Sequence, residues 1–196
     1  MIKAVVFDLN GIFIQAPKLG TRLREDFKVP ENEFLPMLHE IMHKVREPGA
    51  GRAFQYWQSV LRGWKINLSE QGFWDYWFGA EKISEKVVAL AKDLKKKNIQ
   101  VFILSNNFRE RADYYGHYPW IHDAADKVYF SFNTGFIKPD RRAWELILSE
   151  NNLAPGECIY FDDKEKNVLA AESVGIKSFL FTGEEDMEKI IAELVF

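Results

Sequence analysis

The first apolar segment of the chain ends on residues that can do chemistry. The stretch "KAVVFDLNGIFI" (residues 3–14) places Asp8 directly after a run of apolar residues, with Asn10 two positions later and Gly11 next to it. A buried strand that ends on a carboxylate, with a second polar side chain two residues on, is typical of reactive groups at the edge of a parallel sheet. The opening segment therefore predicts part of an active site.

Two later apolar segments end in the same way. The stretch "IQVFILSNN" contains Ser105 and Asn106 at its polar end, and "ECIYFDD" closes on Asp162 and Asp163. Ligands of open α/β sheets bind outside the carboxyl ends of the strands, where helix N-termini add positive potential. We therefore expect these polar ends to converge on one site.

The charges of this set favour phosphate chemistry. Asp8, Asp162 and Asp163 would repel one another unless a divalent cation bound among them, and an all-oxygen set suits Mg²⁺. Lys138, in "FIKPD" just ahead of a helix, could join them and neutralise an incoming phosphate. With Ser105 holding the phosphate oxygens, Asp8 could attack phosphorus and form an aspartyl phosphate, which water would then hydrolyse.

The elements that must position these residues alternate between helix and strand from residue 84 onward. Ser84 is the expected N-cap of a helix with apolar residues at helical spacing, and Gly175 is expected to close another. The predicted helices span residues 84–98, 140–152, 165–175 and 184–195, and the predicted strands 99–107, 157–163 and 177–183. This alternation predicts a doubly wound parallel α/β sheet.

Residues 15–82 break that rhythm and predict a helical cap. The segment is rich in aromatic residues between Phe54 and Phe78, which is more typical of a helical core than of a cofactor site. We therefore expect a core domain of residues 1–14 and 83–196, with a helical cap subdomain of residues 15–82. The basic cap residues Lys18, Arg22, Arg24 and Arg52 are expected as solvated surface charges.

Four motifs in order resemble those of the haloacid dehalogenase (HAD) superfamily: "DLNG", "LSNN", the lysine of "IKP", and "FDDKEKN". The resemblance covers nearly the whole chain. It implies a HAD-like, Rossmann-like fold with a small inserted helical cap. It also implies an Mg²⁺-dependent phosphatase of a small phosphorylated metabolite.

The resemblance assigns the nucleophile and the metal ligands. Asp8 would be the nucleophile and an Mg²⁺ ligand, and residue 10 would bind the metal through its backbone carbonyl. Asp163 matches the metal-binding acid of the fourth motif, and Asp162 would be a second or outer-shell ligand. The retained acid pair argues against a dehalogenase, in which that motif lacks the metal-binding acids.

The resemblance also assigns the phosphate contacts. Ser105 and Lys138 would hold the phosphate, with Asn106 next to it. The lysine also has a simpler interpretation, because "KPD" is an ordinary entry to a helix.

Asn10 departs from the pattern of the phosphatases that the chain resembles. Residue 10 is normally a second Asp there, which gives a proton to the leaving oxygen and then takes one from water. Asn10 cannot ionise, and losing this proton transfer typically slows a reaction about 10² to 10⁴-fold. Three explanations stay open: a naturally slow or non-hydrolytic member, a phosphotransferase or binding relative, or an engineered inactive variant.

Composition excludes several other classes. The 196 residues carry 26 Lys and Arg against 29 Asp and Glu, so a net charge of −3 argues against a nucleic-acid partner. No apolar run approaches the ~20 residues of a membrane span. The N-terminal stretch "MIKAVVFD" is too short, and reaches a charged residue too early, for a signal peptide. The single Cys158 lies in an apolar run and is expected as a buried core thiol. We expect a cytoplasmic protein of undetermined oligomeric state.

Two alternative functions remain. "HEIMH" matches the zinc metallopeptidase pattern through His39, Glu40 and His43, with both histidines on one helix face. Its weakness is the third ligand. The extended form of the pattern has Gly where Arg46 stands, and residues 48–69 contain no Glu, so Glu70 is the first candidate after them. The other alternative is a HAD-fold protein that binds phosphate or a protein partner without turnover.

Overall fold

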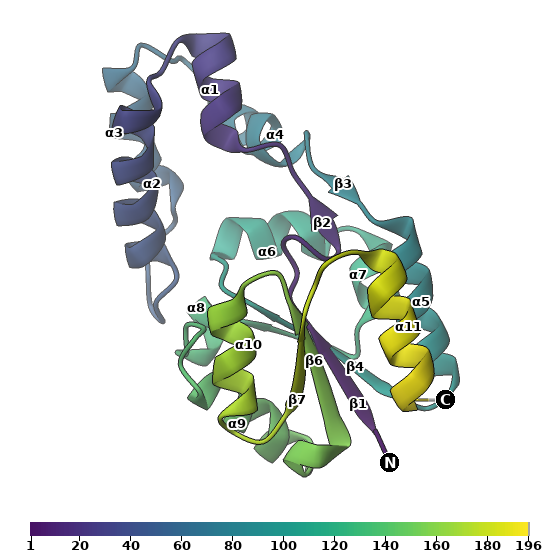
Figure 1. Cartoon of the computed structure of the whole chain (residues 1–196). Helices are drawn as coiled ribbons and strands as arrows, with labels where there is room; N and C mark the ends of the chain where they lie inside the picture. Colours follow the sequence, from purple (N-terminus) through teal and green to yellow (C-terminus); the bar gives the residue numbers. More distant parts are fainter. Residues whose placement is uncertain (196) are drawn as a thin grey trace.

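A five-stranded parallel sheet forms the centre of the computed structural model, which describes residues 1–195 (Figure 1). From one edge to the other the strands are β5 (Lys127–Phe130), β4 (Gln100–Ser105), β1 (Ala4–Phe7), β6 (Cys158–Asp162) and β7 (Lys177–Leu180). Every neighbouring pair is parallel. The Rossmann-like parallel sheet predicted from the sequence is confirmed.

Helices cover both faces of this sheet. Val5 and Phe7 of β1 lie in one hydrophobic cluster, whereas Ala4 and Val6 lie in another, because successive strand residues point to opposite faces. The first cluster packs under α5 (Glu85–Lys96), α6 (Arg109–Gly116), α7 (Pro119–Ala124) and α11 (Glu184–Val195). The second packs under α9 (Arg142–Glu150) and α10 (Glu165–Glu172).

Several local signals of the sequence are found in these elements. The Ser84 hydroxyl caps α5 by accepting a hydrogen bond from the Val87 N–H at 3.1 Å. Gly175 has a φ of +87°, as a residue that ends a helix in the left-handed region should. Cys158 is buried, and this burial raises the pKa of its thiol to about 12. The core also contains the short α8 (Ser131–Thr134) and a 3₁₀ helix at Pro155–Glu157.

Four further helices lie between β1 and α5 in the chain, and we call them the cap: α1 (Leu19–Phe27), α2 (Glu31–Val45), α3 (Phe54–Gly63) and α4 (Glu70–Phe78). The chain leaves the core through β2 (Ile14–Gln15) and returns through β3 (Lys82–Ile83), and these two strands pair antiparallel (Figure 1). The cap has its own hydrophobic cluster, which includes Trp57 and Phe73. The division into domains 1–14 with 83–196 and 15–82 stays a prediction.

The cap is connected to the core through contacts of Phe108, Glu110 and Pro48. Phe108 precedes α6 of the core and contacts the rings of Trp74 and Trp77 in α4. The Glu110 carboxylate accepts a hydrogen bond from the backbone N–H of Ala53 at 2.6 Å. A Cβ added at Gly135 would lie 3.3 Å from the Pro48 ring, so the loop after α2 also reaches the core.

Across residues 1–195, none of the helices combines the length and the apolar character that a membrane span requires.

Candidate active site

The polar strand ends meet at one edge of the sheet. Asp8 directly follows β1, Ser105 ends β4 and Asp162 ends β6, and β1 lies between the other two strands. After β1 the next strand of this sheet along the chain is β4, on one side of β1, whereas β6 lies on the other side of β1 and is followed by β7. The strand order therefore reverses between β1 and β6, which makes this edge a topological switch point. The three residues are 3%, 2% and 0% exposed, so their polar groups must find partners in the protein or in a ligand.

Lys138 places its ammonium group between two carboxylates. Its Nζ lies 2.9 Å from Asp8 Oδ1 and 2.7 Å from Asp162 Oδ2. Burial raises the pKa of Asp8, although the Lys138 ammonium opposes this. Burial would also raise the pKa of Asp162, but the Lys138 charge and the hydrogen bonds to this carboxylate outweigh it, so the pKa is lowered. A buried cation therefore bridges the ends of β1 and β6.

Asp162 uses both of its oxygens within the protein. Its Oδ1 accepts hydrogen bonds from the Lys164 backbone N–H and from Asn167 Nδ2, both at 2.9 Å. Its Oδ2 accepts from Lys138, from the Tyr160 hydroxyl and from Asn167. A carboxylate has about four acceptor positions, and these contacts fill them.

Asp163 has far fewer contacts. A carboxylate oxygen from each of Asp8, Asp162 and Asp163 lies within 4.8 Å of the others, and Asp163 is the exposed member of this group. The nearest cation is Lys164, whose Nζ lies 3.5 Å from Asp163 Oδ1. A Cβ at Gly11, where φ is +92°, would lie 2.8 Å from Asp163 Oδ2, so glycine is needed there. Asp8 and Asp163 thus offer oxygen atoms of the kind that Mg²⁺ binds.

Asn10 is connected to the end of β4 through Asn107. The Asn107 side-chain amide donates to Asn10 Oδ1 at 2.8 Å and to Ser105 Oγ at 2.9 Å. The Ser105 hydroxyl accepts one hydrogen bond in this arrangement and keeps its own proton to donate. It can therefore donate that proton to an anion.

Asn106 contacts the backbone of Lys138 in both directions. Its Nδ2 donates to the Lys138 carbonyl and its Oδ1 accepts from the Lys138 N–H, each at 2.8 Å. The side chain of Asn106 therefore fixes the segment that carries the lysine.

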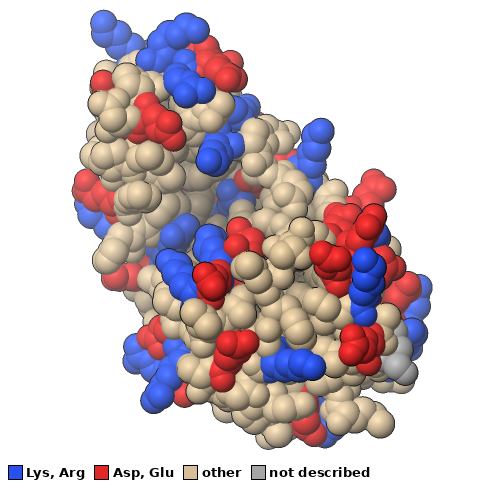
Figure 2. Space-filling model, in the orientation of Figure 1, with Lys and Arg blue, Asp and Glu red and all other residues tan. Residues whose placement is uncertain are grey.

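A cavity of about 290 Å³ lies against these groups, between core and cap. Its core lining includes Asp8, Asn10, Ser105, Asn106, Asn107 and Lys138, and its cap lining is Leu38, Met42, Arg46 and Trp77. Figure 2 shows the hollow between the two parts, with Lys and Arg side chains gathered around it. An anionic ligand of small size suits this space.

A family model of haloacid dehalogenase-like hydrolases matches residues 2–175. The chain belongs to this family. The chain is 24% identical over 192 residues to a sesquiterpene phosphatase of Aspergillus oryzae, covering 89% of this chain and 87% of that one. It is also 24% identical over 204 residues to a D-ribitol-5-phosphate phosphatase of Bacteroides thetaiotaomicron, covering 91% of each. The resemblance drawn from the four motifs is confirmed.

Solved structures show the same fold for this HAD hydrolase. A HAD family enzyme of Bacteroides thetaiotaomicron matches with a TM-score of 0.83 at 19% identity, covering 97% of this chain and 98% of that one. The wild-type complex of that enzyme with magnesium and inorganic phosphate matches with a TM-score of 0.78 at 18% identity, covering 97% and 99%. Magnesium, the cofactor predicted from the sequence, is the ion that this relative holds.

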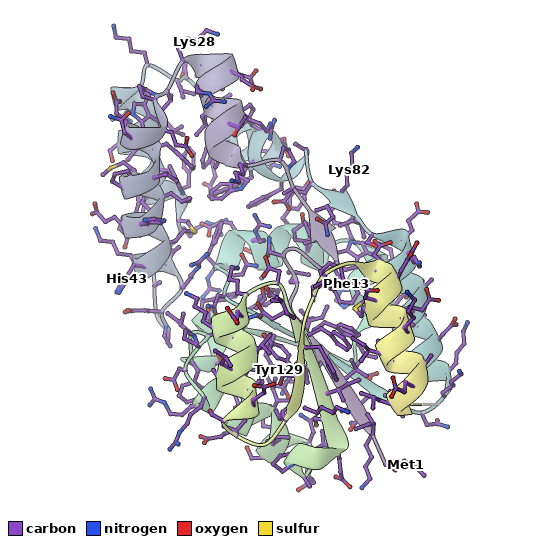
Figure 3. All side chains as sticks on the ribbon, viewed as in Figure 1. Met1, Phe13, Lys28, His43, Lys82 and Tyr129 are labelled. Carbon is purple, nitrogen blue, oxygen red and sulfur yellow. The ribbon has the colours of Figure 1, made fainter. Side chains whose placement is uncertain are left out.

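The zinc-site alternative lacks a third ligand in this HAD hydrolase. His39, Glu40 and His43 are exposed on α2, and the His43 side chain, 80% exposed, lies 3.7 Å from Glu47 (Figure 3). Within residues 1–195, only the acidic group at Asp8 brings three metal-ligating side chains together.

Several residues that line the cavity were not predicted from the sequence, and Asn107 and Arg46 are two of them. Asn107 is part of the "LSNN" motif, but nothing in that motif shows that its amide joins Asn10 to Ser105. In the sequence Arg46 stands out only as a departure from the zinc pattern, whereas in the structure it lines the cavity from the end of α2. The basic cap residues named above, Lys18, Arg22, Arg24 and Arg52, lie outside the cavity lining.

Proposed function

We propose that this protein is an Mg²⁺-dependent phosphatase of a small phosphorylated metabolite, that it forms an aspartyl phosphate on Asp8, and that Asn10 makes it slow. One observation carries the proposal: the buried Asp8 carboxylate ends the central strand, pairs with Lys138 and faces the cavity. The names of the two phosphatase relatives support the same reaction class.

For the cation we assign Asp8 and Asp163, together with the backbone carbonyl of Asn10. The saturated hydrogen bonding of Asp162 supports Asp163 as the direct ligand, with Asp162 holding Lys138 and the loop in place. Bound Mg²⁺ would offset the charge that a phosphate brings next to two carboxylates.

For the phosphate we assign Lys138 and Ser105. The Lys138 ammonium is already beside Asp8, so an incoming phosphate oxygen would meet a positive charge next to the nucleophile. Ser105 keeps a hydroxyl proton to donate, because its oxygen accepts from Asn107. Asn106 contributes to substrate binding through the position of Lys138.

The reaction has two steps, formation and hydrolysis of the aspartyl phosphate, and each step requires a proton transfer. Asp8 Oδ1 accepts from the Leu9 N–H and from Lys138, whereas no hydrogen bond within residues 1–195 reaches Oδ2. An Asp8 oxygen attacks phosphorus, the bond to the leaving oxygen breaks, and that oxygen takes a proton. Water then attacks phosphorus and loses a proton, the bond between phosphorus and the Asp8 oxygen breaks, and inorganic phosphate leaves with the Asp8 carboxylate restored. The amide of Asn10 can neither give the proton to the leaving oxygen nor take the proton from water. Solvent has to carry out both transfers, and turnover is slow because no positioned acid or base assists them.

A panel of phosphorylated metabolites tests this proposal, run with and without Mg²⁺ on the protein and on Asn10→Asp. We expect Mg²⁺-dependent phosphate release, faster in Asn10→Asp and lost when Asp8→Asn is added to that variant. Tight metabolite binding by calorimetry, with no release even from Asn10→Asp, would instead favour a non-catalytic phosphate-binding protein.

A further inference from the structure

Arg46 lies at the C-terminal end of α2, where the cap closes over the cavity. It is the C-cap residue of that helix and lines the cavity together with Leu38 and Met42. The loop that follows is held against the core, through Pro48 next to Gly135 and through Ala53 bonded to Glu110. The position of Arg46 is therefore fixed relative to the core.

Arg46 has no anionic partner within residues 1–195, and its Nε is buried without a hydrogen-bond partner. Arg46 as a whole is half-buried, and the two fully buried cations of the cavity are neutralised: Arg111 makes two hydrogen bonds to Glu81, at 3.1 and 2.8 Å, and Lys138 lies between two carboxylates. Burial, and then the like charge of Arg111, lower the pKa of the Arg46 guanidinium, although the more distant charge of Asp8, with which it makes no ion pair, opposes this. A desolvated charge of this kind is costly unless an anion pairs with it.

The rest of the cavity adds to the positive charge. Lys164 and Lys166 of the loop and helix after β6 also line it, and the Lys166 side chain has no hydrogen bond or ion pair within residues 1–195. Lys138 would pair with a single phosphate. The Arg46 guanidinium on the cap side would then still have no anion to pair with. A planar guanidinium pairs best with a carboxylate or a phosphate, through two parallel hydrogen bonds.

We propose that the substrate carries a second anionic group, a carboxylate or a second phosphate, and that Arg46 binds it while the reacting phosphate lies at Asp8 and Lys138. This inference rests on the proposed phosphatase function of the same site. The cavity of about 290 Å³ restricts the substrate to a small metabolite. The substrate class is thus a phosphorylated acid or a bisphosphate rather than a phosphorylated neutral polyol.

Matched substrates test the inference on the full chain with Mg²⁺: ribitol 5-phosphate, 5-phosphoribonate and ribitol 1,5-bisphosphate. These differ in having a hydroxyl, a carboxylate or a phosphate at the far end, so the two anionic arms tell which group Arg46 prefers. We measure kcat/KM and, by calorimetry, Kd. A hydrogen-bonded charge pair predicts about 10- to 100-fold preference for at least one anionic substrate over ribitol 5-phosphate.

Three variants test whether Arg46 causes the preference for an anionic substrate. Arg46→Met should reduce the ratio to about 1, Arg46→Lys should restore part of it, and Arg62→Met, which removes an exposed arginine of α3 outside the cavity, should leave it unchanged. Equal values for the three substrates in the wild type would overturn the inference, as would an equal loss on all three in Arg46→Met, which would mean that Arg46 serves the reacting phosphate. Absence of hydrolysis in every form would refute the phosphatase function, and the ratio of Kd values would still decide the inference.

Discussion

The Asn107 amide donates a hydrogen bond to Asn10 Oδ1 at 2.8 Å, which connects the loop after β1 to the loop after β4. An aspartate at position 10 would accept the same hydrogen bond, since Asn and Asp have nearly the same shape. The site therefore already holds a side chain at position 10 in a conformation that a carboxyl group can adopt. What is missing there is an ionisable proton.

Lys138→Met should destabilise the fold strongly. It leaves Asp8 and Asp162 buried without the cation that bridges them, and breaking a buried ion pair costs about 3–5 kcal/mol. Burial already raises the pKa of Asp8, and removing the ammonium that opposes this raises it further above the value in the unfolded chain. The loss is therefore smallest at acid pH and grows as pH rises through the raised pKa of Asp8. Urea denaturation at pH 4 and pH 8 checks this, and a loss that does not depend on pH would contradict it. Lys127→Met, at an exposed pair with Glu150, is the control, and it should change the stability little because solvent screens that pair.

Asp162→Asn and Asp163→Asn should affect different properties. Asp163→Asn removes an oxygen charge with few contacts in the protein, so Mg²⁺ affinity should fall at least about tenfold with little change in Tm. Asp162→Asn deprives Lys138 of a partner, so it should cost about 3 kcal/mol of stability. The lowered pKa of Asp162 gives stability at neutral pH that is lost as pH falls, and the variant should lack this part of the acid transition. Titration calorimetry with MgCl₂ and thermal denaturation separate the two. If Asp162→Asn weakened Mg²⁺ binding more than Asp163→Asn, our assignment of the ligand would be wrong.

Gly11→Ala should disturb the metal site from the backbone side. The added Cβ would lie 2.8 Å from Asp163 Oδ2, and a φ of +92° is unfavourable for alanine. We expect a stability loss of about 1–2 kcal/mol and weaker Mg²⁺ binding. Gly63→Ala in α3 is the matched control, because a Cβ there meets nothing within 4 Å. The control should gain roughly 0.5–1 kcal/mol, as alanine does in a helix. Equal Mg²⁺ affinity in both variants would argue that Asp163 does not bind the ion.

Much of the fold and part of the site could be predicted from the sequence. Asp8, Ser105 and Asp162 lie at the ends of buried apolar strands, and parallel strands bring such ends to one edge. β5 is as short as β1 but only its last two residues are buried, and β2 and β3 have two residues each, so they leave little apolar pattern to detect. The helix predicted at residues 184–195 agrees with α11, because its periodicity extends over three turns.

The side-chain partners could not be predicted. Asp162 and Asp163 are adjacent in the sequence, and only the turn after β6 decides which one faces Lys138 and which one stays open. The position of Arg46 depends on how the cap packs on Phe108 and Glu110, which is a tertiary contact without a local signal.

Glu110→Gln should stabilise the protein at neutral pH. Burial raises the pKa of Glu110, although Ala53 and Arg52 oppose this, and its Oε2 is buried without a partner. An acid with a raised pKa in the fold contributes stability below its unfolded pKa and loses it as pH rises through the folded value. The advantage of glutamine should therefore be present at pH 8 and absent at pH 4 in thermal denaturation. Glu70→Gln, which removes the charge of a more exposed carboxylate next to the same Arg52, is the control. A Tm difference between wild type and Glu110→Gln that is the same at both pH values would contradict this account.

The rate of p-nitrophenyl phosphate hydrolysis with Mg²⁺, measured for the wild type and for Asn10→Asp, tests the central claim most directly. The account predicts a rise of at least ~100-fold in kcat for Asn10→Asp, the usual size of acid–base catalysis, and its loss when Asp8→Asn is added. Equal rates for the wild type and Asn10→Asp would contradict it.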